Sequence, residues 1–384
     1  MSNPPSQSYP RRWILLLALL TALGPLSIDM YLPALPLMAE DFGVSTQRVA
    51  NSLPAYFLGL ALGQLVYGPL SDRIGRKTPL YIGLLLYSLA SLLCIFANHE
   101  WSLIAARVLQ ALGGCVGVVI ARAAIRDRLD VQGSAQAFSS MMIVATLAPI
   151  MAPTLGAWVL LFFDWHMIFA FLTGMGVVAW LCVHFFFKET LAPEHRLNLS
   201  FNQVLNLYAV IFKDRQFCFA MFAGCLSGGA LFTYISGSAT VLMDSYGLSE
   251  QSFAYVFGLN AFGIMLFSTI NKHLAKRYSI LQRLKLGGAI QAFGVTLLLL
   301  CGLLSMPLAW VLLGLFLTVA GIGFTGPNAM ALAMSEQGGR AGTASALMGS
   351  MQFAAGLLGG LLLNFLAWSA LMNMALVMLI FIFT

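Results

Sequence analysis

The stretch Gly68-Pro69-Leu70-Ser71-Asp72-Arg73-Ile74-Gly75-Arg76-Lys77 is a charged segment between two apolar runs, at about 48–70 and 79–97. Each run has the roughly 20 residues that a helix needs to cross a bilayer core about 30 Å thick. Lipid offers no hydrogen-bond partners, so the charged segment must lie in water at one membrane surface. The stretch therefore predicts two antiparallel transmembrane helices joined by a short loop.

The composition of the whole chain agrees with this prediction. Of the 384 residues, 60% are hydrophobic and only 9% are charged, and the mean hydropathy is +0.87. These values are far from those of soluble globular proteins. We predict twelve spans, at about 13–36, 48–70, 79–97, 102–125, 135–160, 165–187, 217–243, 252–271, 283–304, 308–334, 341–366 and 369–384.

The formal net charge of +6 follows from how the basic residues are distributed. If both termini are cytoplasmic, every Lys and Arg lies on the cytoplasmic side except Arg48, which is outside, and Arg107, which is within a span. This asymmetry is typical of the positive-inside rule. The basic composition therefore indicates membrane topology, and no nucleic-acid partner is expected.

One acid interrupts the first apolar run, within the sequence Leu26-Ser-Ile-Asp-Met-Tyr-Leu-Pro33. A charged side chain at membrane depth costs about 2.5 to 3.5 kcal/mol by insertion measurements, so Asp29 indicates ion or proton handling, with a structural ion pair as the alternative. Gly24-Pro25 removes a backbone hydrogen bond about one turn earlier, which predicts a kink or loosened segment there. At about 1.5 Å per residue, Asp29 and Arg107 share a depth. We expect the two side chains to pair, directly or through water.

Other kinds of site find no support in the residue pattern. All six cysteines fall in apolar spans, so no disulfide framework is expected. The five histidines have no metal-ligand spacing, and no serine or cysteine has a plausible base, so neither a metal site nor an enzyme is expected. The segment Gly75-Arg76-Lys77-Thr78 looks like the tail of a phosphate-binding loop, but its glycine spacing and residue order are wrong.

Three motifs resemble those of the major facilitator superfamily. The loop between helices two and three matches at Gly68, Asp72, Arg73, Gly75, Arg76 and Lys77. Residues 103–113 resemble the helix-four motif, with Arg107, Gln110 and Gly113. A third stretch resembles the helix-five antiporter motif of drug exporters, at Ala148, Pro149, Ala152, Pro153 and Gly156. Glycines are usual in that motif at three positions where this chain has Ala148, Ala152 and Ala157. Ala148, Ala152 and Gly156 still form one small face.

The stretches 25–36, 164–169 and 188–191 narrow the resemblance to the bicyclomycin-resistance (Bcr/CflA) branch of drug:proton antiporters. The resemblance covers essentially the whole chain. It implies an all-α membrane protein of twelve transmembrane helices in two pseudo-symmetric six-helix bundles, the major facilitator fold. Residues 272–287 weakly repeat residues 68–83, as expected of two parallel halves.

We expect a cytoplasmic lead at 1–12, an N-terminal bundle at 13–187, a central cytoplasmic loop at 188–214 and a C-terminal bundle at 215–384. In the central loop, apolar residues recur at helical spacing at Phe201, Val204, Leu205, Tyr208 and Phe212. This spacing predicts either an amphipathic helix on the membrane surface or a linker helix packed on protein. The last span ends at Thr384 without a basic tail, so truncation at this end is an open alternative.

We expect particular residues to carry the function. Asp29 and Arg107 would couple proton movement to transport, since moving the pair apart would change the proton affinity of the carboxyl. In the related proteins a conformational latch joins the charged loop to helix eleven, near residues 340–343, where a helix N-terminus favours an anion. In this chain the latch would comprise Gly68, Asp72, Arg73, Gly75, Arg76 and Asp127. The residues expected to line the substrate cavity, with ordinary packing as the alternative, are Tyr31, Tyr56, Met141, Met142, Tyr234, Asn260 and Gln352.

The sequence thus predicts a proton-coupled efflux antiporter for small, partly apolar compounds, in which two bundles rock around a midplane cavity. The resemblance implies antibiotics such as bicyclomycin or sulfonamides as substrates. The proton gradient would supply the energy without a cofactor, and the chain would be a monomer in the bacterial inner membrane with both termini cytoplasmic. Two alternatives remain. One is a proton-linked transporter, exporter or importer, of an endogenous metabolite such as a nucleoside or amino acid. The other is a structural membrane protein that transports nothing.

Overall fold

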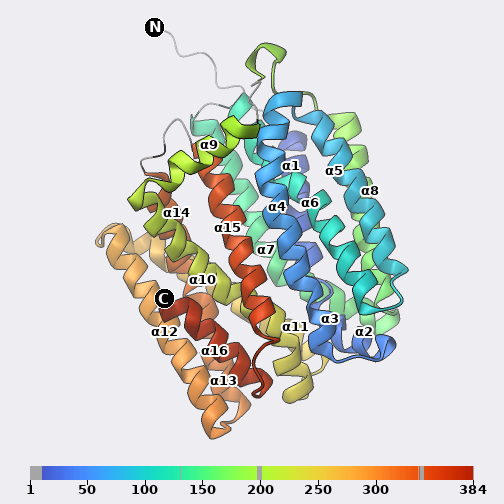
Figure 1. Cartoon of the computed structure of the whole chain (residues 1–384), viewed down its shortest axis with the longest axis vertical. Helices are drawn as coiled ribbons and strands as arrows, with labels where there is room; N and C mark the ends of the chain where they lie inside the picture. Colours follow the sequence, from blue (N-terminus) through green and yellow to red (C-terminus); the bar gives the residue numbers. More distant parts are fainter. Residues whose placement is uncertain (1–10, 130, 197–200, 336, 338–340, 384) are drawn as a thin grey trace.

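The computed structural model describes residues 11–129, 131–196, 201–335, 337 and 341–383, and in this part of the chain every regular element is a helix (Figure 1). Most of the predicted N-terminal lead, Arg340 of the predicted latch and Thr384 lie outside the described residues.

The first half of the chain folds into helices that run back and forth between two ends of the molecule. They are α1 (Arg11–Asp29), the 3₁₀ turn η1 (Leu32–Ala34), α2 (Leu35–Phe42), α3 (Thr46–Ala50), α4 (Ser52–Ile74), α5 (Lys77–Ile95), α6 (Glu100–Arg128), α7 (Val131–Phe162) and α8 (His166–Phe186).

The 3₁₀ turn η2 (Pro193–His195) and the linker helix α9 (Phe201–Phe212) lead to the second half. Its helices are α10 (Arg215–Ala239), the π-helical turn η3 (Thr240–Ser245), α11 (Glu250–Leu274), α12 (Ile280–Leu304), α13 (Leu308–Ala320), α14 (Ile322–Met334), α15 (Ala341–Leu362) and α16 (Ala370–Phe383).

The twelve predicted spans are confirmed. Ten helical segments are long and apolar enough to cross a membrane, and Thr146–Phe162 and Ala370–Phe383 are shorter apolar helices at the two remaining positions. Several spans are built from two elements, such as α3 with α4 and α13 with α14. The fold is the predicted all-α arrangement of two pseudo-symmetric bundles.

The pseudo-symmetry is visible in the packing of two glycines that the sequence repeat aligns. A side chain at Gly83 would collide with Val116, so α5 lies directly against α6. A side chain at Gly287 would collide with Phe324 and Thr325, so α12 lies equally close to α14. Small residues allow such close approach between membrane helices, where lipid supplies no hydrophobic drive for association.

The two bundles meet along two seams, α4 against α15 and α7 against α11. In Figure 1, α4 and α15 lie side by side between the blue-to-green helices of the first bundle and the yellow-to-red helices of the second. We name the two ends of the molecule after residues near them: the Arg76 end, where α4 ends and α5 begins, and the Asn51 end, where α3 meets α4.

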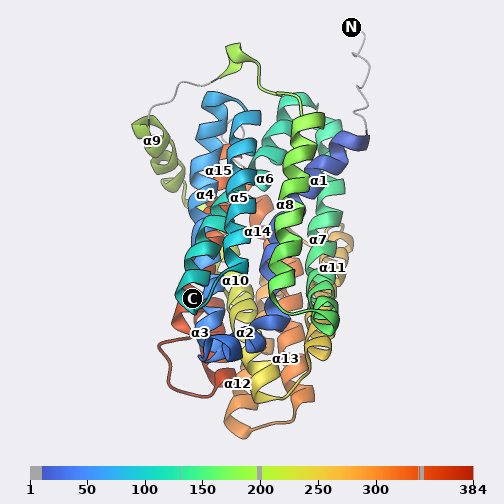
Figure 2. The same cartoon turned by 90° about the vertical axis from the view of Figure 1, so that its right-hand side faces the viewer.

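The linker helix α9 lies at the Arg76 end (Figures 1 and 2). It packs on α10 and α15, and the Tyr208 hydroxyl lies 3.5 Å from the carbonyl oxygen of Leu65, which accepts its hydrogen bond. Of the two alternatives for this segment, the contacts favour a linker helix packed on protein. The side chains of Phe201, Val204 and Leu205 lie outside the described residues.

Candidate functional site

Asp29 is the last residue of α1, so the chain breaks immediately after the acid. The helix continues through Pro25 and gives way to a turn and to η1, which begins just before Pro33. The helix is therefore not interrupted at Gly24-Pro25, where a kink or loosened segment was predicted, and the break in the first span follows Asp29 instead. The side chain of Asp29 is only 3% exposed, and its Oδ1 has no hydrogen-bond partner among the residues described.

Arg107 of α6 is completely buried. Its Nη1 donates to Gln110 Oε1 over 2.5 Å, and its guanidinium carbon lies 4.4 Å from the ring centroid of Tyr31 and 4.1 Å from that of Tyr56. An aromatic face attracts a cation most strongly where water is excluded. The arginine is thus held by two rings and one amide, while its Nε and Nη2 have no partner in the described part of the chain.

Of the two expected arrangements of Asp29 and Arg107, the direct pair is absent in this conformation, and pairing through water stays a prediction. No ion pair joins the two described side chains, although Arg107 is the charged group that acts on Asp29 through space. The physical reason is that Tyr31 and Tyr56 lie against the guanidinium and take the place of a carboxylate. The acid and the base belong to one buried region but are separate within it.

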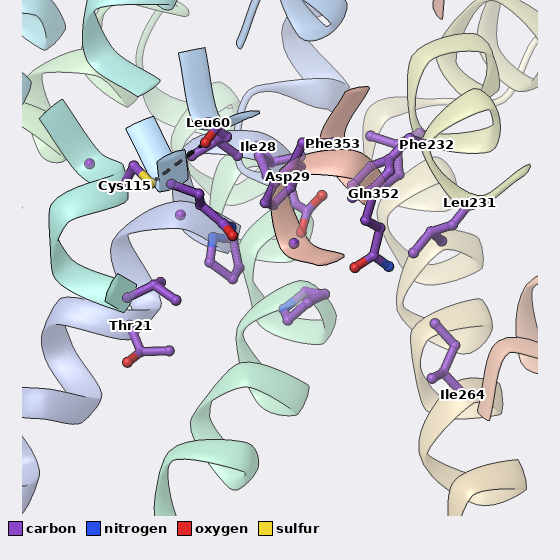
Figure 3. A pocket seen from close by; sticks show the side chains of 18 of the residues that line it. Thr21, Ile28, Asp29, Leu60, Cys115, Leu231, Phe232, Ile264, Gln352 and Phe353 are labelled. Atoms are coloured by element: carbon purple, nitrogen blue, oxygen red, sulfur yellow. Dashed lines mark hydrogen bonds between the residues drawn. The ribbon is translucent and has the colours of Figure 1, made fainter. Parts of the chain in front are cut away.

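A cavity of about 320 Å³ lies between the two bundles and is lined mainly by apolar side chains. Asp29 borders it from the first bundle and Gln352 from the second, and both point into the same space (Figure 3). Leu231, Phe232 and Phe353 form much of the opposite wall. The only charged side chains among the described lining residues are Asp29 and Arg122. We call this space the deep cavity.

A second space of about 800 Å³, which we call the vestibule, lies toward the Arg76 end. It shares Gln64, Arg122, Met330 and Ser345 with the deep cavity, so the two are adjacent. Asp72, Arg76 and Gly342 also line the vestibule. The deep cavity is therefore approached from the Arg76 end.

Contacts between the bundles close the Asn51 end. At this end Asn364 Nδ2 donates to Asn51 Oδ1 over 2.7 Å, and nearer the middle of α4 and α15 Ser350 Oγ donates to the carbonyl oxygen of Ala61 over 2.9 Å. Next to the deep cavity, the ring of Phe57 lies 4.5 Å from that of Phe232 and 6.3 Å from that of Phe353, measured between centroids. These aromatic rings, one from the first bundle and two from the second, separate the cavity from the Asn51 end.

Charged groups of the loop after α4 gather around Arg76, whose side chain is buried. Its guanidinium donates to Asp127 over 2.9 and 3.2 Å, to Asp72 over 2.5 Å and to Ser71 Oγ over 2.8 Å. Arg73 points away and is exposed. The predicted residues Asp72, Arg76 and Asp127 are thus brought together, while no hydrogen bond joins Asp72 to the described part of α15.

Gly75 has a φ of 95°, a conformation that favours glycine. A side chain there would lie only 2.6 Å from Glu189 Oε2. Glu189 accepts from the backbone N–H groups of Arg76 at 2.9 Å and Lys77 at 3.1 Å, the exposed start of α5. α5 has no side-chain cap of its own, and the carboxylate of Glu189, which is distant in the chain, caps its N-terminus instead.

Partial burial raises the pKa of the Glu189 carboxyl, but four backbone N–H donors outweigh that effect and hold the pKa below its ordinary value. The other two donors are the N–H groups of Thr190 and Leu191. The capping role of Glu189 was not predicted from the sequence. The signal that could have found it is the absence of a capping residue before Lys77, combined with the acid at the end of the sixth span.

The helix-five motif lies where α7 approaches α1. Ala148, Ala152 and Gly156 are all buried, and a side chain at Gly156 would collide with the carbonyl oxygen of Met30. Pro149 lines the deep cavity, and Pro153 is buried one turn further along α7. The small face thus packs the broken end of the first span.

The residues predicted to line the cavity divide into two groups. Tyr234 and Gln352 line the deep cavity. Four others are buried and do not border it: Tyr31, Tyr56, Met141 and Asn260. The Tyr31 hydroxyl shares a 2.8 Å hydrogen bond with Ser52 Oγ, and Asn260 donates to the Tyr234 hydroxyl over 2.9 Å. Their contact with substrate stays a prediction for another conformation. The side chain of Met142 lies outside the described residues. Phe232, Phe353 and Arg122 also line the deep cavity, which was not predicted from the sequence.

Arg122, which the charge distribution places on the cytoplasmic side, lines the deep cavity as well as the vestibule. Within the described ranges, no group of His, Cys, Asp or Glu side chains is arranged to hold a metal ion.

The family model described as Major Facilitator Superfamily matches residues 17–360. An uncharacterised MFS-type transporter, YdgK of Bacillus subtilis, is 37% identical over 339 residues, 88% of this chain and 84% of the relative. A bicyclomycin resistance protein homolog of Haemophilus influenzae is 31% identical, over 91% of this chain and 87% of the relative. A multidrug resistance protein, MdtL of Salmonella paratyphi B, is 30% identical, over 89% and 85%.

Among solved structures, a D-xylose–proton symporter superposes with a TM-score of 0.76 at 15% sequence identity, covering 98% of this chain and 97% of the symporter. At this identity the similarity concerns the fold alone. It agrees with the two-bundle arrangement described above.

Proposed function

This chain belongs to the major facilitator superfamily, and from that premise we propose that it is a proton-coupled exporter of small, partly apolar drugs. The observation that carries the proposal is the carboxyl of Asp29, which borders the deep cavity with one oxygen unpartnered. An acid in a membrane protein that faces a transport cavity is a candidate for carrying the transported proton.

We orient the molecule with the Arg76 end in the cytoplasm. Basic residues gather at this end, and the positive-inside rule assigns such an end to the cytoplasm of the bacterial inner membrane. Both termini then face the cytoplasm. In this orientation the conformation is inward-open, with the vestibule leading to the cytoplasm and the aromatic rings closing the outer side.

Transport requires that the deep cavity open alternately to either side, which in this fold occurs when the bundles rock against each other. The seams α4–α15 and α7–α11 would be the surfaces that rearrange. In the outward-open state Asp29 takes up a proton from outside. Drug entering from the cytoplasm then competes for the cavity and favours release of that proton to the cytoplasm.

Arg107 contributes a fixed positive charge near Asp29, since a guanidinium stays protonated throughout. Its two unpartnered nitrogens leave room for a new contact when the bundles move. A change in the distance between the two groups would change the proton affinity of the carboxyl, which is how rocking is coupled to proton movement.

The loop around Arg76 acts as the latch of the outward-open state. There, Asp72 would meet the N-terminus of α15, whose free amides favour an anion. In the inward-open conformation Asp72 instead accepts from Arg76, and both Asp72 and Gly342 border the vestibule that separates them. Closing the vestibule brings the two groups together.

The substrate class rests on the cavity and on the relatives. Its apolar lining suits partly apolar compounds better than highly polar metabolites. The names of two relatives refer to bicyclomycin and multidrug resistance, which favours drugs over an endogenous nucleoside or amino acid. The exporter would work as a monomer, with the proton gradient as its energy source and no cofactor.

The test is drug-induced proton release from the purified, detergent-solubilised protein at low buffer concentration. Wild type is expected to release protons when bicyclomycin or a sulfonamide is added. Asp29→Asn should bind drug yet release none, and in vesicles it should lose uphill export. Asp41→Asn is the matched control, because Asp41 accepts from Trp165 outside the cavity. Proton release from Asp29→Asn equal to that of wild type would assign coupling to another group.

A further inference from the structure

Arg122 lies on α6 at the junction of the deep cavity and the vestibule, and it lines both. Its side chain is exposed to this space. Gly117, on the same helix, packs on Leu20 of α1. At a rise of about 1.5 Å per residue, the backbone of Arg122 therefore lies about 20 Å from that of Asp29 along the bundle, toward the Arg76 end.

The guanidinium of Arg122 has no counter-ion in the described ranges. The nearest carboxylates that line the vestibule are occupied: Asp72 accepts from Arg76, and Asp127 accepts from Arg76 and Thr190. Arg126, one turn further along α6, adds a second positive charge. Its guanidinium lies against Gly342, within 3.4 Å of where a Cβ would be.

Arg122 is exposed to the cavity, so its charge keeps contact with water, but among the described residues it gains no carboxylate partner. The residues that line the deep cavity together with Arg122 include Val118 and Val319, which cannot accept a hydrogen bond, and Met330, whose sulfur is only a weak acceptor. Gln64 and Ser345 are neutral and shared with the vestibule. This corner of the cavity therefore lacks a negative charge.

We propose that Arg122 binds the anionic group of acidic substrates, so that the exporter prefers compounds with an apolar body and a weakly acidic group. The inference rests on the proposed function and names its substrate class. A guanidinium presents a planar fork of donors that suits a carboxylate or an ionised sulfonamide. The apolar body would occupy the deep cavity against Phe232 and Leu231, leaving Asp29 free to exchange its proton.

The test compares two probes that differ by one methyl group, which replaces the ionisable hydrogen and so removes the negative charge. One is an N-heteroaryl benzenesulfonamide at a pH where its N–H has ionised, and the other is its N-methyl derivative, which cannot ionise. Equilibrium binding to the purified full chain is measured for wild type, Arg122→Gln and Arg122→Lys. Wild type should bind the anion about tenfold more tightly than the neutral probe, a difference of about 1.4 kcal/mol. Arg122→Gln should bind both within twofold, and Arg122→Lys should keep the preference.

Arg126→Gln is the matched control, because it removes the same charge one turn away, from a residue that lines only the vestibule. It should change the preference less than twofold. Equal binding of the two probes to wild type, absence of anion binding, or an unchanged preference in Arg122→Gln would overturn the inference and leave Arg122 a residue that serves topology. Should Arg122→Gln bind neither probe, the test rests on Arg122→Lys. If Arg122→Lys still binds the neutral probe but has lost the preference for the anion, the inference is overturned.

Binding is measured without a proton gradient, so its outcome is independent of whether Asp29 couples transport. Failure of the proposed function appears as absent drug-induced proton release, whereas failure of this inference appears as an absent charge preference.

Discussion

The two bundles share a fold but handle charge differently. The first holds Asp29 and Arg107 in its interior and joins Arg76 to Asp72 and Asp127 at its end. Several buried polar contacts among the described residues of the second bundle join neutral groups: Asn260 donates to Tyr234, and Ser227 bonds to Thr325 over 2.5 Å and to Gln291 over 3.1 Å. Amides and hydroxyls keep the same charge throughout a transport cycle, whereas carboxylates can gain protons. Pseudo-symmetry of the backbone therefore does not extend to chemistry, and we assign coupling to the first bundle.

Removing the buried cation of the first bundle should have the largest effect. Arg107→Ala is expected to abolish uphill export and to weaken drug binding at least tenfold, because Tyr31, Tyr56 and Gln110 lose the group around which they pack. Binding titrations and vesicle transport measure both effects. Arg283→Ala is the control from the second bundle, since its guanidinium contacts Asn271 near the Arg76 end. Equal damage from both variants would contradict the comparison.

The charged loop should show the next largest effect. Asp72→Asn is expected to cut turnover about tenfold with drug binding within twofold of wild type, because a lost latch favours the inward-open state. The sequence repeat aligns Asp72 with Lys276 of the second bundle, which is exposed. Lys276→Gln should therefore leave turnover unchanged. Normal export by Asp72→Asn would mean that the loop charges serve only topology.

Helix capping also differs between the bundles. α5 is capped by Glu189 from beyond α8, whereas α12 begins with its own capping box, Ser279 with Gln282. Glu189→Gln should cost about 1 kcal/mol of stability near neutral pH and slow transport about two- to threefold. Ser279→Ala should cost a similar amount without affecting the latch.

The two caps should respond differently to pH. Because the folded-state pKa of Glu189 is lowered, its contribution is present above the unfolded value and is lost as the pH falls through the folded value. The difference in unfolding temperature between Glu189→Gln and wild type should therefore shrink from neutral to acidic pH. The difference between Ser279→Ala and wild type should persist. A Glu189→Gln difference that did not change with pH would contradict the cap.

The smallest effect on transport is expected inside the second bundle. Ser227→Ala leaves Gln291 Oε1 without this donor and should lower stability by about 1 to 3 kcal/mol. Proton release per bound drug should be unchanged, because no group that titrates is altered. Loss of coupling in this variant would show that the second bundle also carries part of the proton pathway.

The spans and the repeat were predictable because both follow from local pattern. A helix in lipid must satisfy its own backbone and needs a fixed length of apolar residues, so hydropathy along the chain predicts each span. The charged loops interrupt the spans, and the same loop position recurs in each half. Asp72, Arg76 and Asp127 could be grouped through the family motif, and the structure brings them within hydrogen-bond distance.

The interior of the site was less predictable. The shared depth of Asp29 and Arg107 suggested a pair, direct or through water, but two tyrosines lie against the guanidinium, and their positions depend on how α1, α4 and α6 are rotated about their axes. Tyr31 and Tyr56 were expected to line the substrate cavity; they are buried, do not line the deep cavity in this conformation, and their contact with substrate stays a prediction.

The amino-acid sequence alone predicts the membrane class, the number of spans and the two-bundle fold, and it identifies Asp29 as an acid within an apolar span. Only the tertiary structure decides that Glu189 caps a helix more than a hundred residues earlier, that Arg122 faces the cavity, and that the aromatic rings close the Asn51 end. The pattern of hydrophobic residues along the chain indicates which residues are buried in lipid or protein. The mutual rotation and tilt of the helices, and the choice between conformations of similar energy, depend on contacts between segments that are distant in the chain.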